Sequence, residues 1–165
     1  MLNDKELVFI KDNLYSDTDK LLLKYHKIKG EDIDYMYCIN QIKLRKKFSD
    51  KFPFLTKRDD FLFPLSLNLE QSSSEYTAMY KSLLVEKGES VLDLTSGFGI
   101  DDIYFSKKAS RIVCVEQNKM LVDLLSHNFN SLKAENYLCV NADCQEYLMN
   151  VEGFDVIYLD PARRD

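Results

Sequence analysis

The sequence predicts an α/β protein in which helices cover both faces of a parallel sheet, with a small helical module ahead of it. Short apolar runs recur in the second half of the chain, and helix-length segments separate them, which is typical of βαβ units. Residues 1–48 show helical periodicity instead. With 165 residues, of which 45% are hydrophobic, the chain is long enough for one main core and a smaller module.

The bulk composition narrows the class of protein. A net charge of -5 argues against a protein that coats nucleic acid by overall charge, although it leaves room for a local basic patch. The four cysteines show no paired spacing, so we expect reduced cysteines and no metal site. No apolar run reaches the length of a membrane span, and the N-terminus lacks the pattern of a signal peptide. These features predict a cytoplasmic protein without membrane association.

The first part of the chain is predicted to be a helical module. Asn3 and Glu6 have the spacing of a capping box, and a third helix over residues 32–48 ends in the basic run "KLRKK". From residue 49 to residue 70, Pro53 and Pro64 exclude a regular helix. The many aromatic residues of this segment predict an ordered connector that packs against the main domain.

The main domain begins with a helix for which Ser72 and Glu75 form a capping box. Four apolar runs then predict strands at residues 90–95, 111–116, 136–141 and 154–160, with helices at 100–109, 118–132 and 144–149 between them. The expected division is a helical module with its connector at residues 1–63 and an α/β domain at residues 64–165.

Ligands of such sheets bind beyond the carboxyl ends of the strands. After the first strand, Gly97 and Gly99 permit a tight turn and close approach of the backbone to a ligand. Glu116 ends the second strand, about twenty residues further on, where a carboxylate can accept hydrogen bonds from ribose hydroxyls. Asp143 follows the third strand and suits either an adenine amine or the N-cap of the next helix.

The acidic residues of this region indicate what kind of ligand fits. A dinucleotide fingerprint expects a third glycine where this chain has Asp102, and Asp93, Asp101 and Asp102 would repel a pyrophosphate. A ligand with a cationic end and an adenosine, such as S-adenosylmethionine, is better suited. An NAD-linked oxidoreductase is therefore disfavoured.

Four motifs in order resemble a known family: "VLDLTSGFGID", "VCVEQN", "NADCQEYL" and "IYLDPARRD" are similar to successive motifs of the class I S-adenosylmethionine-dependent methyltransferases. Together with "LNLEQSSSEYTAMYK", they resemble RNA methyltransferases that carry a THUMP-like domain further along the chain. The resemblance covers residues 64–165. It implies a Rossmann-like sheet of seven strands in the order 3-2-1-4-5-7-6, of which this chain supplies the part 3-2-1-4. We therefore expect the chain to be the front part of a longer enzyme, with strands five to seven beyond it.

The resemblance also implies roles for individual residues. The expected cofactor-binding residues are Asp93, Thr95, Gly97, Phe98, Gly99 and Asp101 around the methionine end, Glu116 at the ribose, and Asp143 and Cys144 at the adenine. The expected catalytic residues are Asp160, Pro161 and Arg163, at the family's fourth motif.

In that motif many members that methylate amines carry Asp or Asn, then two prolines, then an aromatic residue that stacks on a flipped base. Asp160 retains the carboxylate that can orient an acceptor amine. Arg163 stands where the aromatic residue is expected and offers a planar cation to a phosphate or a base face. This substitution puts methylation of a base nitrogen in doubt but leaves RNA as the substrate.

Two surfaces are candidates for partners. The basic stretch from Lys43 to Arg58, with Arg163 and Arg164, suits RNA phosphates, although a solvated helix face is an equally good reading of the stretch. The fourth strand would form an exposed apolar edge, which predicts a homodimer through that edge.

The sequence thus predicts S-adenosylmethionine-dependent methyl transfer to tRNA or rRNA, with the chain alone expected to bind cofactor weakly and to lack turnover. The alternative is a catalytically silent fragment that binds RNA or a protein.

Overall fold

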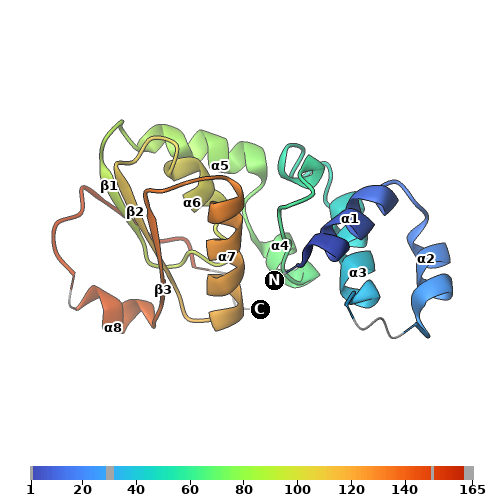
Figure 1. Cartoon of the computed structure of the whole chain (residues 1–165). Coiled ribbons are helices and arrows are strands. Elements are labelled where there is room, and N and C mark those ends of the chain that lie inside the picture. The colour runs from blue at the N-terminus through green and yellow to red at the C-terminus, as the bar shows by residue number, and fades with distance from the viewer. Residues whose placement is uncertain (1, 29–31, 150, 162–165) are drawn as a thin grey trace. The chain divides into compact units, whose positions relative to one another are not determined.

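The computed structural model describes residues 2–28, 32–149 and 151–161 of the chain. The chain divides into two compact units, Met1–Phe63 and Pro64–Asp165 (Figure 1). Within the described residues, no helix is both long and apolar enough to cross a lipid bilayer.

The first unit consists mainly of helices. These are α1 (Asp4–Asn13), α2 (Thr18–Tyr25), α3 (Tyr35–Lys47) and the short 3-10 helix η1 (Leu55–Lys57). The predicted capping box at Asn3 and Glu6 is confirmed, because each side chain accepts a hydrogen bond from the other residue's backbone N–H. Phe9 and Ile10 of α1 pack with Cys38, Ile39 and other apolar side chains into the core of this unit.

The connector after α3 is ordered, and its aromatic side chains pack on α3. Phe61 and Phe63 are fully or nearly fully buried. The Gln41 side chain donates to the Phe63 carbonyl at 2.8 Å and accepts from the Phe63 N–H at 3.0 Å. These contacts lie within the first unit, and the expectation that the connector also packs against the main domain stays a prediction.

The second unit is the predicted α/β domain. Its elements in chain order are α4 (Ser66–Gln71), α5 (Glu75–Lys81), η2 (Ser82–Leu84), β1 (Ser90–Asp93), α6 (Ile100–Phe105), β2 (Arg111–Glu116), α7 (Lys119–Ser131), β3 (Tyr137–Asn141), α8 (Cys144–Leu148) and β4 (Val156–Tyr158). All four strands are parallel and lie in the order β3-β2-β1-β4. The predicted fold class and strand order are confirmed.

Helices cover both faces of this sheet (Figure 1). Leu92 of β1 and Val113 of β2 join Tyr147 of α8 in an apolar cluster on one face. The helices α6 and α7 contact β2 and lie on the opposite face. Successive strand residues point to opposite faces, so a strand covered on both sides is apolar along its buried part, as Ile112–Val115 of β2 are.

Two local predictions are wrong. Helix α4 follows Pro64 within the segment expected to lack a helix, because a proline ahead of a helix does not interrupt its hydrogen bonds. The N-cap of α5 is Ser74, whose hydroxyl accepts from the Thr77 N–H at 3.1 Å, so the predicted cap at Ser72 is two residues too early.

The amino ends of β1 and β4 are joined side by side. The Asp155 carboxylate accepts from both the N–H and the hydroxyl of Ser90, each at 2.8 Å, and the Asp155 N–H donates back to the Ser90 hydroxyl at 3.1 Å. These bonds lower the pKa of Asp155. They fix the register of β4 against β1 at the edge of the sheet opposite the carboxyl ends.

Candidate functional site

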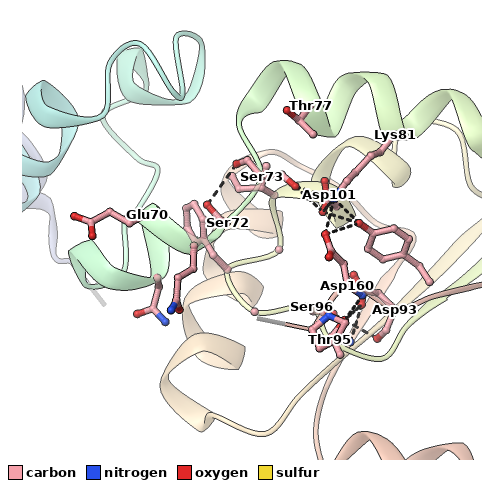
Figure 2. Close-up of a pocket in the computed structure, with 18 residues that line it drawn as sticks. Glu70, Ser72, Ser73, Thr77, Lys81, Asp93, Thr95, Ser96, Asp101 and Asp160 are labelled. Carbon is pink, nitrogen blue, oxygen red and sulfur yellow. Dashed lines mark hydrogen bonds and ion pairs between the residues drawn. The ribbon is translucent and has the colours of Figure 1, made fainter. Parts of the chain in front are cut away.

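A pocket of about 510 Å³ lies at the carboxyl ends of β1 and β4 (Figure 2). Its lining includes the turn from Gln71 to Ser73 ahead of α5, the loop from Thr95 to Asp101 after β1, and Asp160 with Pro161 after β4. Side chains of α4 and α5 and the ends of β1 and β4 complete it: Asn68, Glu70, Thr77, Lys81, Asp93 and Tyr158. From β1 the chain continues to β2 and β3 on one side of the sheet and then returns to β4 on the other side of β1. The strand order therefore reverses between β1 and β4, and α/β sheets bind ligands at such a switch point.

The loop after β1 needs its glycines. Gly97 and Gly99 have positive φ angles of 53° and 77°, a conformation that side chains other than glycine rarely adopt. A Cβ atom on Gly99 would lie 2.1 Å from Cδ1 of Leu125 on α7. The glycines therefore let the loop lie against α7 while its backbone faces the pocket, as the sequence predicted for a ligand-binding turn.

Glu116 lies beside this loop rather than among the residues that line the pocket. Its carboxylate accepts from the Gly97 N–H at 3.0 Å and from the Asn118 N–H at 2.7 Å. The side chain of Asp143 caps α8 by accepting from Gln145 and Glu146, and Cys144 packs in the apolar cluster beneath α8. The N-cap role of Asp143 is thus present, and the roles of all three residues toward a ribose or an adenine stay predictions.

Two acids lie buried next to the loop, and one of them, Asp93, also lines the pocket. Asp93 is 2% exposed and Asp102 is fully buried, and neither oxygen of Asp102 has a hydrogen-bond donor in the part of the chain that the structure describes. Burial raises the pKa of Asp93 to about 7, and burial followed by the neighbouring Asp93 raises that of Asp102 as well. Both shifts favour the protonated form of these carboxyl groups. The expectation that Asp102 would repel a ligand in the loop is corrected, because its side chain is in the core.

The structure brings Lys81 into the pocket, and the sequence interpretation missed it. The Lys81 ammonium donates to the Ser73 hydroxyl at 2.8 Å, to Asp101 Oδ2 at 2.9 Å and to Asp160 Oδ2 at 2.7 Å (Figure 2). Burial lowers its pKa, but hydrogen bonds to Asp160, Tyr158 and Asp101 outweigh that effect and raise the pKa overall. A possible signal was the spacing of Thr77 and Lys81, which places two polar side chains on one face of a helix.

The loop after β4 is held close to the loop after β1. The backbone N–H of Asp160 donates to the Thr95 hydroxyl at 2.8 Å. The Tyr158 hydroxyl lies 3.0 Å from Asp101 Oδ2 and 3.3 Å from Asp160 Oδ2, and burial raises its pKa, so the phenol stays protonated. Pro161 lines the pocket. Arg163 and Arg164 lie outside the described residues.

The basic stretch in the helical unit is only partly on the surface. Lys43, Lys46, Lys47 and Lys57 are exposed. Arg45 is 2% exposed, and its guanidinium donates to backbone carbonyls, including that of Phe61 at 2.5 Å. Arg45 is therefore not available to a phosphate, contrary to its inclusion in the predicted stretch.

Comparison with known proteins identifies relatives of the chain. The family described as Conserved hypothetical protein 95 matches residues 77–163. A tRNA (uracil(54)-C(5))-methyltransferase from Pyrococcus horikoshii is 30% identical over 115 residues, which are 67% of this chain and 27% of the relative. Ribosomal RNA small subunit methyltransferase J from Bdellovibrio bacteriovorus is 33% identical over 88 residues, which are 49% of this chain and 35% of the relative.

A solved structure is similar over nearly the whole chain. The crystal structure of a candidate methyltransferase from Porphyromonas gingivalis W83 has a TM-score of 0.81 and 32% identity, and the match covers 99% of this chain and 43% of that one. The chain spans 29% and 27% of the length of two curated Pyrococcus relatives that it matches. Because the family model matches more than half of its residues, the chain belongs to the family described as Conserved hypothetical protein 95.

Proposed function

We propose that the α/β unit binds S-adenosylmethionine at the carboxyl ends of β1 and β4, and that the protein transfers the methyl group to RNA. The observation that carries this proposal is the pocket at the switch point of a β3-β2-β1-β4 sheet, bounded by a glycine loop and by carboxylates. The names of the relatives, which are tRNA and rRNA methyltransferases, support the choice of RNA as the substrate class.

The residues of the pocket fit the charge of this cofactor. Oδ1 of Asp101 is buried and has no hydrogen-bond donor among the described residues, so it suits the ammonium of the methionine end. The turn at Gly97 and Gly99 leaves the loop backbone open to a ligand, with Thr95 and Phe98 beside it. The bound cofactor would supply an electrophilic methyl group on a sulfonium.

Three further residues would contact the adenosine part of the cofactor. Each oxygen of the Glu116 carboxylate accepts from one backbone N–H, which leaves further acceptor capacity on both oxygens for ribose hydroxyls. Asp143 and Cys144 follow the neighbouring strand β3 and would border the adenine.

On the target side, Asp160 and Pro161 would orient the acceptor group of the RNA. Asp160 is held through its backbone by Thr95 and is exposed at the mouth of the pocket, so its carboxylate can reach both the pocket and a bound substrate. Orientation of the acceptor is the main protein contribution to a methyl transfer of this kind. Arg163 and Arg164 would contact phosphate or a base face.

The remaining surface contacts belong to the same proposal. Lys43, Lys46, Lys47 and Lys57 would contact phosphates of a tRNA or rRNA, and that binding should weaken as salt concentration rises. A protein with such a substrate would be cytoplasmic.

A homodimer through β4 is also proposed. Among the described strands, β4 pairs with β1 alone, and Ile157 is 56% exposed. Light scattering on the purified chain would give the mass, and a strictly monomeric mass at high micromolar concentration would exclude the dimer.

The first test of the function is a calorimetric titration with S-adenosylhomocysteine, with NAD as the control ligand. We expect micromolar binding of S-adenosylhomocysteine, and a loss of about tenfold or more in Glu116→Ala because the ribose loses its acceptor. Glu135→Ala, an exposed acid ahead of β3 at the other end of the strands, should bind as the parent does.

Three results would contradict the proposal in different ways. Binding of NAD alone would favour an oxidoreductase. Salt-sensitive binding of RNA without any binding of S-adenosylhomocysteine would favour a silent RNA-binding fragment. Binding of none of these ligands would reject the nucleoside pocket itself.

A further inference from the structure

The Lys81 ammonium connects parts of the α/β unit that are far apart in sequence. Lys81 is the last residue of α5, Asp101 lies in the first turn of α6, and Asp160 follows β4. The ammonium contacts Oδ2 of Asp101 at 2.9 Å and Oδ2 of Asp160 at 2.7 Å (Figure 2). One cation therefore lies between the carboxylate nearest the glycine loop and the carboxylate nearest the pocket mouth.

This arrangement is partly shielded from water. The side chains of Lys81 and Asp101 are 20% and 14% exposed, whereas that of Asp160 is 57% exposed. The ammonium also lies 5.3 Å from the centre of the Tyr158 ring and 2.6 Å from its hydroxyl. The shielding makes the pair with Asp101 stronger than an exposed pair, and the cation is shared with an Asp160 carboxylate that solvent can reach.

Lys81 and the Tyr158 hydroxyl both contact Oδ2 of Asp160, at 2.7 Å and 3.3 Å. The Asp160 backbone is already fixed by its bond to Thr95, so rotation of its side chain is the freedom that the Lys81 contact restricts. Because Lys81 also bonds Asp101, any ligand that competes for Asp101 changes what Lys81 can offer to Asp160.

We propose that Lys81 is a positioning residue that couples cofactor binding at Asp101 to the orientation of Asp160 at the target side. This inference rests on the proposed function, since it takes Asp101 as a contact of the cofactor's ammonium. As that ammonium engages Asp101, Lys81 shifts its interaction toward Asp160 and holds that carboxylate in place for the acceptor group. By linkage, the charge on Asp160 then affects the affinity for the cofactor, although Asp160 does not contact its ammonium.

A double-mutant cycle on the affinity for S-adenosylhomocysteine tests this coupling. Asp160→Asn leaves Lys81 with Asp101 as its remaining carboxylate, so the ligand ammonium meets stronger competition and affinity falls about three- to tenfold. In a Lys81→Met background, the same Asp160→Asn change should alter affinity by less than about twofold. Lys81→Arg retains a cation with room for two carboxylates and should retain most of the coupling.

Two controls separate coupling from damage to the fold. The nucleoside 5'-methylthioadenosine has no amino-acid group, so its affinity should show no coupling between positions 81 and 160. Lys87→Met removes an exposed lysine just after the same helical segment and should leave every affinity unchanged. A thermal melt of each variant checks that the pocket is folded.

The outcomes are distinct. Coupling of about fivefold or more for S-adenosylhomocysteine and none for 5'-methylthioadenosine supports the inference. Additive effects, or equal coupling for both ligands, would overturn it while leaving the proposed function in place. If the parent chain binds neither ligand, the proposed function fails, and the inference fails with it.

Discussion

The two units of the molecule bury charged side chains of opposite sign, a guanidinium in the helical unit and a pair of neighbouring acids in the α/β unit. In the helical unit, Gln41 and Arg45 lie in the core with partners close by: the Gln41 amide bonds both backbone groups of Phe63, and the Arg45 guanidinium donates to carbonyls of the connector. In the α/β unit, Asp93 and Asp102 lie in the core beside each other, and Asp102 has no hydrogen-bond donor among the described residues.

The buried polar groups of the two units have different roles. A buried donor that meets carbonyls holds the chain in place, so the polar groups of the helical unit stabilise its connector. Two buried acids in contact destabilise the fold at neutral pH unless they retain a proton. Such an arrangement is typical of a functional site, and it lies directly behind the glycine loop.

The largest expected effect tests the structural role of Arg45. Arg45→Met removes donors from four carbonyls, those of Gln41, Arg58, Asp59 and Phe61, and should lower the free energy of unfolding of the helical unit by about 3–5 kcal/mol. Hydrogen exchange of α3 amides would measure it.

Lys43→Met, an exposed change on the same helix, is the matched control and should alter that free energy by at most about 0.5 kcal/mol. Equal effects of the two variants would mean that the buried contacts of Arg45 contribute nothing to the free energy of unfolding.

A smaller effect of opposite sign is expected for Asp102→Asn, which should stabilise the α/β unit by about 1–3 kcal/mol at pH 8. The raised pKa values mean that the native pair keeps a proton which the unfolded chain releases above its ordinary pKa of 3.8. The contribution of the pair to stability is therefore complete at lower pH and is lost as pH rises toward and through about 7.

Thermal unfolding at several pH values would show this as a gain at pH 8 that disappears near pH 3. Asp123→Asn, an exposed acid on α7, is the control. A loss of stability at pH 8 in Asp102→Asn would show that the buried pair does not lower the free energy of unfolding.

The smallest expected effect concerns Glu75, a buried acid of the α/β unit that does have a partner. The Tyr104 hydroxyl donates to Glu75 Oε1 at 2.7 Å, and burial raises the Tyr104 pKa. Tyr104→Phe should therefore lower stability by about 1 kcal/mol, whereas Tyr80→Phe, with a ring that is 72% exposed, should change it little. Urea unfolding would compare them. A gain in stability in Tyr104→Phe would contradict the expectation that this hydrogen bond stabilises the buried Glu75 carboxylate.

Local patterns in the sequence were sufficient for most of the fold. The strand over residues 111–116 was predicted with its observed bounds, because a continuous apolar run between turns has one reading in a sheet covered on both faces. The tight turn at Gly97 and Gly99 was expected because glycine adopts positive φ angles that other residues rarely adopt. The cap of α5 was misplaced because three consecutive serines each satisfy the local rule.

Contacts between distant residues were beyond the sequence. Lys81 contacts Asp101 and Asp160 across separations of 20 and 79 residues. The spacing of Thr77 and Lys81 indicates a polar helix face but does not identify either partner. Arg45 was counted as a surface cation because charge in a sequence says nothing about burial. Asp102 was expected to repel a pyrophosphate because it lies at the start of the helix after the glycine loop, although consecutive helix residues point in different directions and its side chain is buried.

The bonds between Ser90 and Asp155 have a consequence at the far end of the sheet. They fix the amino ends of β1 and β4 side by side, so the number of residues in each strand determines which side chain reaches the pocket. One residue inserted after Asp155 would bring Ile157 to the position now held by Tyr158 and carry the carboxylate of Asp160 past the loop at Thr95. The relative position of the pocket side chains therefore depends on the length of each strand. A substitution within either strand preserves this position, whereas a single insertion changes it.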